Sequence, residues 1–362
     1  MAIRSSEALR QFSPVRIALP MAVGLAMVGY LLYAEWVKSG LSWSEVEERL
    51  VWTPRAFAYL TLALSMVPVR EFGYIWQLRL LTDRRLSWTA CFQVVVLWNF
   101  SAAVSPSIVG GTAVAVFMLL KEGLSVGRTT TIVFTTIFLD QFFYTTIPLS
   151  VSFLVPQDDI FAPLHSIKAE WVGTSVVAAF WSAWGGLLAY VVFLIAALFV
   201  APGWIHWWLD KFLGLPWMSR WRERGLHMSE DLLTASRDLR RRPVRFWLAV
   251  WAATSLAWFG RYWILNAVLG AYSPVPMGFY DYVLASARQA VLWVLMVISP
   301  TPGSAGIAEL GFSWLFRDLV PVGMALTLAV VWRLLAYYPY LIVGVPVMTR
   351  WIKRVYGRDV RD

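Results

Sequence analysis

Charged side chains interrupt the apolar segments of this 362-residue chain. A charge inside a bilayer is costly, so such residues face water or a partner and mark substrate or ion pathways by default. Arginine offers several N–H donors, and carboxylates accept them, so the two types together can hold a phosphate group through exchangeable ion pairs. The predicted substrate-binding residues are Arg70, Glu71, Asp140, Arg261, Arg288, Glu309 and Arg333.

The same residues also have a simpler interpretation, in which arginine–carboxylate pairs between helices only hold the bundle together. Asp281 and Arg288 share one helix face, being seven residues apart. Asp140 and Glu309 are also candidates for coupling movement to protons or sodium. The sequence leaves these alternatives open.

Catalytic and metal-binding patterns are weak. His165, His206 and His227 lie in expected loops or interfaces without metal-ligand spacing, and Cys91 is the only cysteine. Phosphate-loop, nucleophile-elbow and zinc-protease motifs are missing from the sequence. We therefore expect no catalytic residue, no metal and no cofactor.

The elements that position these residues are expected to be membrane helices. Hydrophobic residues form 59% of the chain and the mean hydropathy is +0.61, which indicates a polytopic membrane protein. The first apolar segment follows three arginines and reads as a retained signal anchor. Segments of spanning length are expected at 17–37, 55–76, 129–154, 172–200, 244–268 and 321–346. Two shorter apolar segments are expected at 88–104 and 280–298.

The formal net charge of +9 comes from basic residues at segment ends. That distribution is typical of cytoplasmic loops beside anionic lipid, so we expect a bacterial cytoplasmic (inner) membrane protein with both termini cytoplasmic. The basic loop 203–243 is expected to lie on anionic lipid, and we expect no nucleic-acid partner.

The charge pattern requires two additional changes of direction. Basic and acidic loops fall on opposite sides only if the chain returns once between 105 and 123 and again between 299 and 318. Both stretches begin with helix breakers, and non-helical backbone at membrane depth must be shielded by protein or line a polar cavity. The predicted re-entrant tips contain Ser105, Pro106, Gly110, Gly111, Pro300, Pro302, Gly303 and Gly306.

The two returning stretches also resemble each other. Each has Ser-Pro, a small-residue cluster, an apolar run and then a base and an acid, Lys121-Glu122 and Arg317-Asp318. Opposite direction in two similar segments indicates an inverted-topology repeat. We predict an all-α membrane domain over 1–362, of about eight transmembrane helices plus two re-entrant hairpin elements. Its two halves are 1–170 and 171–362.

The stretch Pro302-Gly303-Ser304-Ala305-Gly306-Ile307-Ala308-Glu309 resembles the P-G-x-x-G-x-x-E pattern of the lysylphosphatidylglycerol synthase transmembrane family. A second stretch also resembles the family's pattern, with the glycine pair at 110–111 followed by Leu-Leu-Lys-Glu-Gly at 119–123. Many relatives carry an acid and an arginine shortly after the first glycine cluster, where this chain has Thr112 and Val114.

The resemblance implies a flippase fold that moves a lipid between leaflets. Because a short basic tail follows the last segment, we expect no aminoacyl transferase domain and no lysyl-lipid synthesis. The expected cargo is an anionic phospholipid, a glycolipid or a polyprenyl-phosphate-linked lipid, and a lipid-modifying or glycosyl-transferring enzyme is a possible partner. The alternatives are a membrane-embedded enzyme acting on headgroups through Asp140 or Glu309, and a non-transporting scaffold for a lipid-modifying enzyme.

Overall fold

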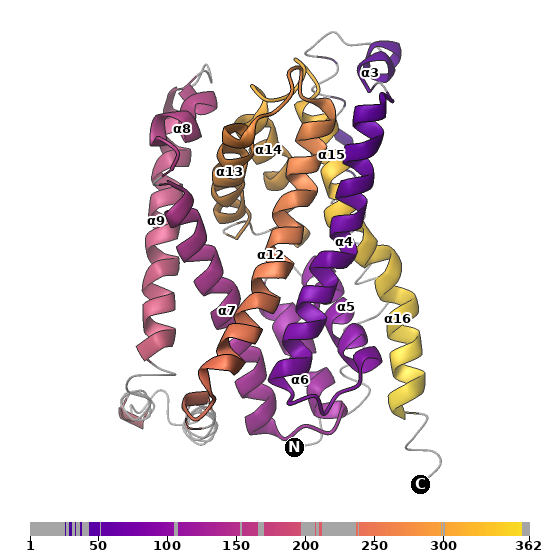
Figure 1. Cartoon of the computed structure of the whole chain (residues 1–362), viewed down its shortest axis with the longest axis vertical. Helices are drawn as coiled ribbons and strands as arrows, with labels where there is room; N and C mark the ends of the chain where they lie inside the picture. Colours follow the sequence, from indigo (N-terminus) through magenta and orange to yellow (C-terminus); the bar gives the residue numbers. More distant parts are fainter. Residues whose placement is uncertain are drawn as a thin grey trace.

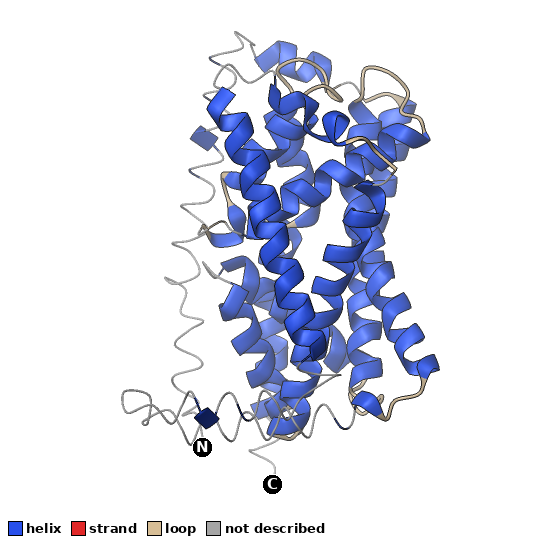
Figure 2. Cartoon of the chain, turned by 90° about the vertical axis from the view of Figure 1, so that its left-hand side faces the viewer, coloured by secondary structure: helices blue, strands red, loops and turns tan. Residues whose placement is uncertain are grey.

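A computed structural model shows how the chain is arranged (Figure 1). It describes residues 43–50, 52–104, 108–152, 154–165, 170–196, 239–297 and 301–356, with scattered single positions elsewhere. All regular structure in these ranges is helical, as Figure 2 shows, which confirms the predicted all-α class. The first apolar segment, most of the basic loop 203–243, Ser105, Pro106 and Pro300 lie outside the described residues.

Long helices run along the length of the molecule (Figure 1). They are α4 (Pro54–Leu81), α7 (Val126–Ser152), α9 (Glu170–Ile195) and α12 (Val244–Tyr272). At about 1.5 Å per residue each exceeds the roughly 30 Å of a bilayer's hydrocarbon core. α15 (Ala325–Ala336) and α16 (Tyr338–Tyr356) follow one another with one residue between them.

Apolar length alone identifies fewer spans. Among the described residues, two helices are long and apolar enough to cross a membrane, over Thr174–Ile195 and Ala325–Val355. α4 and α12 are as long, but they carry the charged residues Arg70, Glu71 and Arg261 in their central turns. The predicted number of spanning helices stays a prediction.

Shorter helices form two hairpins. α5 (Trp88–Val104) and α6 (Ile108–Lys121) lie in the lower half of the molecule in Figure 1. α13 (Phe279–Val297), the 3₁₀ turn η3 (Pro302–Ser304) and α14 (Ile307–Phe316) lie in the upper half. α3 (Trp43–Arg49) and α8 (Gln157–His165) are short helices at the upper end. Both breaker clusters therefore lie where a hairpin reverses.

The turn of the second hairpin needs glycine for a local reason. Gly303 and Gly306 have φ values of 56° and 85°, in the region that residues with a Cβ rarely adopt. Gly306 also precedes the first residue of α14, so the breakers end one helix and begin the next. The first hairpin begins its return differently, because Gly110 and Gly111 lie within the first turn of α6.

Helices α4 and α12 pack antiparallel. The Arg55 side chain near the start of α4 donates to the carbonyl of Gly270 near the end of α12, over 3.0 Å. Further along, Gln77 donates to the Thr254 hydroxyl over 2.7 Å, inside the bundle. These contacts place the two helices side by side along most of their length.

The crossing of α4 and α12 is reciprocal. A Cβ on Gly73 would lie 2.5 Å from the backbone nitrogen of Ala257. A Cβ on Gly260 would lie 2.8 Å from the backbone nitrogen of Arg70. Each glycine lies three residues beyond the residue that the other glycine contacts, so each helix presents the same pattern to its partner. The two backbones approach closely in the second half of each helix.

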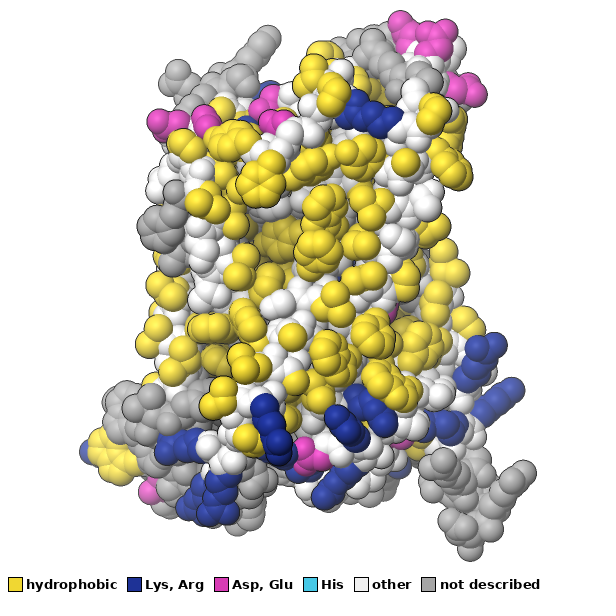
Figure 3. Space-filling model, in the orientation of Figure 1, with side chains coloured by type: hydrophobic (Ala, Val, Ile, Leu, Met, Phe, Trp, Pro, Cys, Tyr) yellow, Lys and Arg dark blue, Asp and Glu magenta, His cyan; other side chains and the backbone are white. Residues whose placement is uncertain are grey.

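Charge divides the ends of the molecule. In Figure 3 acidic side chains gather at the upper end, basic side chains at the lower end, and apolar side chains fill the band between. This distribution is the one expected of a helical protein that crosses a bilayer with its basic end toward the cytoplasm.

Candidate functional site

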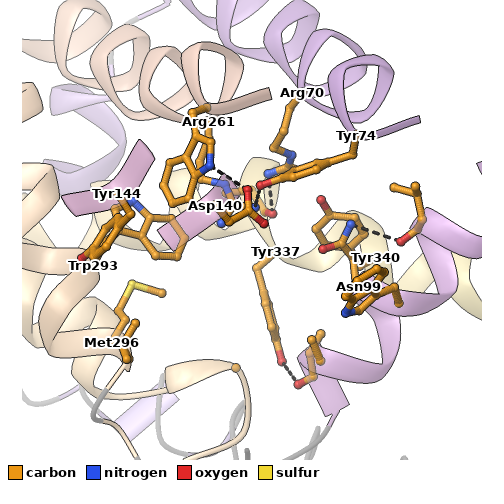
Figure 4. A pocket seen from close by; sticks show the side chains of 18 of the residues that line it. Arg70, Tyr74, Asn99, Asp140, Tyr144, Arg261, Trp293, Met296, Tyr337 and Tyr340 are labelled. Atoms are coloured by element: carbon orange, nitrogen blue, oxygen red, sulfur yellow. Dashed lines mark hydrogen bonds between the residues drawn. The ribbon is translucent and has the colours of Figure 1, made fainter. Parts of the chain in front are cut away.

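A cavity of about 380 Å³ lies inside the bundle where both hairpins reverse. Its wall includes Ala103 at the end of α5, Thr112 in α6, and Gly303 in η3. Long helices supply the remaining wall (Figure 4). The predicted residues that line it are Arg70 from α4, Asp140 from α7, Arg261 from α12 and Arg333 from α15.

Arg70 is 2% exposed and is held from three directions. Its Nε lies 2.9 Å from the Glu71 carboxylate, and its Nη1 donates to the Ala336 carbonyl over 3.0 Å. The guanidinium lies over the Tyr340 ring, 4.9 Å from its centroid. The Tyr340 hydroxyl in turn donates to Glu71 over 2.5 Å. Arg70 therefore faces the cavity, whereas Glu71 supports it from outside the wall.

Arg261 lies between two indole rings. Its guanidinium is 4.9 Å from the ring centroid of Trp258 and 4.8 Å from that of Trp293. Its Nη2 donates to the Tyr74 hydroxyl over 3.1 Å, as Figure 4 shows. Cation–π contacts of this kind stabilise a desolvated guanidinium while leaving N–H groups for other partners.

Asp140 lies close to this aromatic group. One carboxylate oxygen accepts a hydrogen bond from the Trp258 indole N–H over 2.9 Å. Trp258 therefore contacts both charged residues of this side of the cavity, the acid through its N–H and Arg261 through its ring. The arrangement fixes an acid and a base next to the same ligand space.

Arg333 joins the cavity to the second hairpin. Its Nε lies 3.1 Å from Glu309, an ion pair that lacks the alignment of a hydrogen bond. Its Nη2 donates to the Gly303 carbonyl over 2.7 Å, and its guanidinium lies 3.9 Å from the Tyr337 ring centroid. The other Glu309 oxygen accepts from the Gly306 backbone N–H over 2.7 Å. Glu309 thus caps α14 behind the wall.

Arg288 lies elsewhere. It donates to both carboxylate oxygens of Asp318 over 2.7 and 2.9 Å, and to the backbone carbonyl of Asp159 in α8 over 2.7 Å. These partners belong to the upper, acidic end of the molecule, and Arg288 is not part of the cavity wall. Asp281 instead accepts from the backbone N–H of Gly278, at the start of α13.

The predicted tip residues also differ in whether they line the cavity. Gly303 lines the cavity, Pro302 lies in η3, and Gly306 begins α14. Gly110 and Gly111 lie at the start of α6, where a Cβ on Gly111 would be 2.9 Å from the Ala102 side chain in α5. The hydroxyl of Tyr337 donates to the Ala103 carbonyl over 2.9 Å, so one side chain beside Gly303 also reaches the first hairpin.

Most of the cavity wall consists of residues that sequence reasoning missed. Helical spacing held a signal for some of them, because positions three or four apart share a face. Tyr74 lies four residues after Arg70, Tyr144 lies four after Asp140, and Trp258 lies three before Arg261. The missed aromatic and amide residues include Tyr74, Trp98, Asn99, Gln141, Tyr144, Trp258, Trp293, Trp332, Tyr337 and Tyr340.

Metal ligands are not grouped in the part of the chain that the structure describes. Its histidine, cysteine, aspartate and glutamate side chains form no set of three or more that could hold an ion. The arrangement instead offers guanidinium, indole and phenol groups around one cavity, which suits the recognition of an anion.

Comparison with known proteins identifies the fold's relatives. A family model for the lysylphosphatidylglycerol synthase TM region matches residues 17–344. The chain is also 25% identical, over 327 residues, to a UPF0104 membrane protein of Archaeoglobus fulgidus. That alignment covers 86% of this chain and 90% of the relative. The match to the family model extends over nearly the whole chain, and this helical membrane protein therefore belongs to the lysylphosphatidylglycerol synthase TM region family.

Proposed function

We propose that the protein is a flippase that moves an anionic lipid between the leaflets of the membrane. The headgroup occupies the cavity, while the acyl or prenyl tails stay in lipid. The observation that carries this proposal is the presence of three arginines, Arg70, Arg261 and Arg333, on the wall of one cavity. An arginine has five N–H donors, so each can add a phosphate oxygen to the partners it already has.

The paired acids support release as well as binding. Glu71 and Glu309 hold Arg70 and Arg333 from behind, and Asp140 lies on the wall. When a headgroup leaves, Glu71 and Glu309 remain as partners of Arg70 and Arg333, so these two arginines are not left as unpaired buried charges. A site that is charge-compensated in both states suits transport, which requires release as much as capture.

The two hairpins support a transport mechanism of the inverted-repeat kind. We assign the re-entrant elements to α5–α6 and α13–α14, because Ala103 and Thr112 of the first hairpin and Gly303 of the second line the cavity. The halves are 1–170 and 171–362, and their α4 and α12 cross through matching glycines. Alternating access would come from one half rocking against the other around the headgroup.

Catalysis is supported less well. Asp140 and Glu309 are the acids that an enzyme acting on headgroups would use. The first accepts from an indole N–H, and the second caps a helix and pairs with Arg333. Both sets of contacts position charge, and the described residues show no nucleophile held beside either acid.

The membrane setting and partners follow from the charge distribution. We place the protein in a bacterial cytoplasmic (inner) membrane, with both termini and the basic loop 203–243 on the cytoplasmic side and the loop against anionic lipid. A lipid-modifying or glycosyl-transferring enzyme that makes or uses the cargo is the partner that such a flippase would need.

A vesicle assay tests the proposal. Proteoliposomes containing fluorescent phosphatidylglycerol are treated with dithionite, which bleaches only the outer leaflet, and fluorescence loss reports flipping. We expect faster loss than in protein-free vesicles, and at least tenfold slower flipping for Arg261→Gln. Arg55→Gln is the matched control, because Arg55 lies at the end of α4 outside the cavity.

The proposal is wrong if folded protein moves no labelled anionic phospholipid, glycolipid or polyprenyl phosphate faster than empty vesicles do. Folding is checked in each preparation by monodisperse elution and by the thermal unfolding midpoint. Equal activity of the Arg261→Gln variant and the parent would contradict the assigned site while leaving the activity itself in place.

A further inference from the structure

Apart from Arg333 Nε, which already faces Glu309 in an ion pair, four side chains on the cavity wall carry a buried polar atom without a hydrogen-bond partner among the described residues. Three of these atoms are donors, Arg70 Nη2, Arg261 Nε and Trp293 Nε1. The fourth is an acceptor, the carbonyl oxygen Oε1 of Gln141. Buried polar groups in native proteins are nearly always paired, so four unpaired atoms around one cavity need an explanation. A bound ligand supplies one.

The three donors match an anion. Arg70 and Arg261 come from α4 and α12, the helices that cross at the matching glycines, and both project into the space shown in Figure 4. Phosphate oxygens are strong acceptors for guanidinium and indole N–H groups. A phosphodiester seated between these side chains would pair the three donors that lack a partner among the described residues.

The acceptor on Gln141 requires something more. A phosphodiester has only acceptor oxygens, so it cannot donate a hydrogen bond to the Gln141 carbonyl oxygen. A ligand that also pairs this oxygen carries O–H or N–H donors. Gln141 follows Asp140 in α7, so these donors would lie at the α7 side of the cavity.

A hydroxyl fits this place better than an ammonium group. The faces of Trp258 and Trp293, which would attract a cation, already carry the Arg261 guanidinium at 4.9 and 4.8 Å. A second cation beside them would be repelled by the first. Neutral hydroxyls meet no such repulsion, and they can donate to Gln141 while accepting from neighbouring donors.

The size and lining of the cavity allow a ring. Its volume of about 380 Å³ lies in the range of sites that hold small organic molecules. Further aromatic rings on the wall, including Trp98, Trp332 and Tyr74, offer flat surfaces for contact with the C–H groups of a saturated ring. A bare phosphate would leave this surface uncovered.

We propose that the cavity selects a phosphodiester headgroup that carries free hydroxyls on a ring, that is, a phosphorylated sugar or cyclic polyol. Arg70, Arg261 and Trp293 bind the phosphate, and Gln141 accepts from a ring hydroxyl. This inference rests on the proposed transport function and narrows its cargo.

Isothermal titration calorimetry on the full chain in detergent micelles tests the selection. The probes are dihexanoyl phosphatidylinositol and dihexanoyl phosphatidylcyclohexanol, which share charge, tails and ring size and differ only in the ring hydroxyls. We expect the inositol lipid to bind at least tenfold more tightly. Equal affinity, or tighter binding of the cyclohexanol lipid, overturns the proposal.

A pair of glutamine variants locates the effect. Gln141→Leu should reduce the preference for the inositol lipid to less than threefold while leaving the affinity for the cyclohexanol lipid unchanged. Gln93→Leu is the matched control, because Gln93 also has a buried, unpaired Oε1 but lies outside the cavity wall. The assignment to Gln141 fails if both variants behave alike, or if Gln141→Leu weakens both lipids equally.

Two further probes test whether the ligand is a lipid or a soluble molecule, and whether its hydrogen-bond donor is a hydroxyl or an ammonium group. Inositol 1-phosphate tests a soluble ligand, and binding as tight as that of the lipid would mean that the site takes free polyol phosphates. Dihexanoyl phosphatidylethanolamine tests an ammonium donor, and tighter binding than the inositol lipid would overturn the hydroxyl preference. Phosphatidylglycerol and phosphatidylcyclohexanol carrying fluorescent tails are also compared in the flipping assay. If both lipids flip but calorimetry shows no preference for ring hydroxyls, this inference fails while the transport function stands.

Discussion

The two hairpins are held differently at their turns. In the second, Glu309 and Arg333 form a buried ion pair, and each also bonds to the turn backbone, at Gly306 and Gly303. Beside the turn of the first hairpin, two contacts between described residues are neutral. Tyr337 donates to the Ala103 carbonyl, and Gly111 packs against Ala102.

The far ends of the hairpins are alike. Glu122, after α6, pairs with Arg354 and accepts from the Trp351 indole. Asp318, after α14, pairs with Arg288. The difference is therefore confined to the turns beside the cavity. The ion pair of Glu309 and Arg333 therefore fixes the second turn as part of the cavity wall.

The largest effect should come from breaking the charged turn. Glu309→Ala leaves Arg333 buried without its acid, which costs about 3–5 kcal/mol of unfolding free energy. Chemical denaturation in detergent micelles measures this loss. The double change Glu309→Leu with Arg333→Leu should recover most of it, because it removes both charges. A loss below about 1 kcal/mol for the single change would mean that the turn is not fixed by this pair.

Glycine substitutions at the two turns should differ next. Gly303→Ala places a Cβ 2.3 Å from the Tyr337 ring at a φ of 56°. The ring cannot easily move, because Arg333 lies on it and its hydroxyl holds Ala103. We expect a loss of about 1–3 kcal/mol from overpacking.

Gly111→Ala is the comparison variant, and we expect a smaller loss than at Gly303, because helix propensity favours alanine and partly offsets the 2.9 Å approach of the new Cβ to Ala102. The same denaturation experiment measures both. Equal losses at Gly303 and Gly111 would remove the contrast between the turns.

A smaller effect should follow from cutting the link between the turns. Tyr337→Phe removes the hydrogen bond to the Ala103 carbonyl and keeps the ring beneath Arg333. The expected loss is about 0.5–1.5 kcal/mol. If the first turn moves during transport, flipping should also change, and hydrogen exchange should rise around Ala103. Unchanged exchange there would show that this bond does not restrain the first hairpin.

The smallest effect concerns the loop before α5. Hydrogen bonds from Arg242 lower the pKa of the Asp83 carboxyl, assisted by the charge of Arg128. A lowered folded-state pKa stabilises the fold above the unfolded pKa of about 3.9 and loses that contribution as pH falls further. Asp83→Asn should therefore be less stable than the parent at pH 6, with the gap closing below pH 4. Thermal unfolding across pH measures it, and a gap independent of pH would contradict the assignment.

Sequence reasoning located the helices well because apolar length and breakers are local properties. The predicted segment 244–268 corresponds to α12 over Val244–Tyr272. The last prediction, 321–346, ended early because α16 continues to Tyr356 through a basic, amphipathic turn that hydropathy does not report. The re-entrant assignment and the two halves stay predictions.

The cavity was predictable only in part. The cost of placing a charge in lipid predicts a functional role for Arg70 and Arg288 alike, yet Arg70 lines the cavity and Arg288 pairs with Asp318. Which of them faces the ligand depends on how helices pack, and a single sequence does not encode that locally. The aromatic wall was hidden for another reason, because 22 tryptophans along the chain make any one of them unremarkable.

The matching glycines of α4 and α12 also set how far the molecule could move. Gly73 and Gly260 lie past the centres of helices of 28 and 29 residues, so the helical arms on either side of the contact are about 12 to 28 Å long. A backbone contact this close resists sliding but allows rotation about the contact point. Turning by about 10° would shift the arm tips by roughly 2 to 5 Å in opposite directions at the two ends. A single crossing point can thus widen one entrance while it narrows the other.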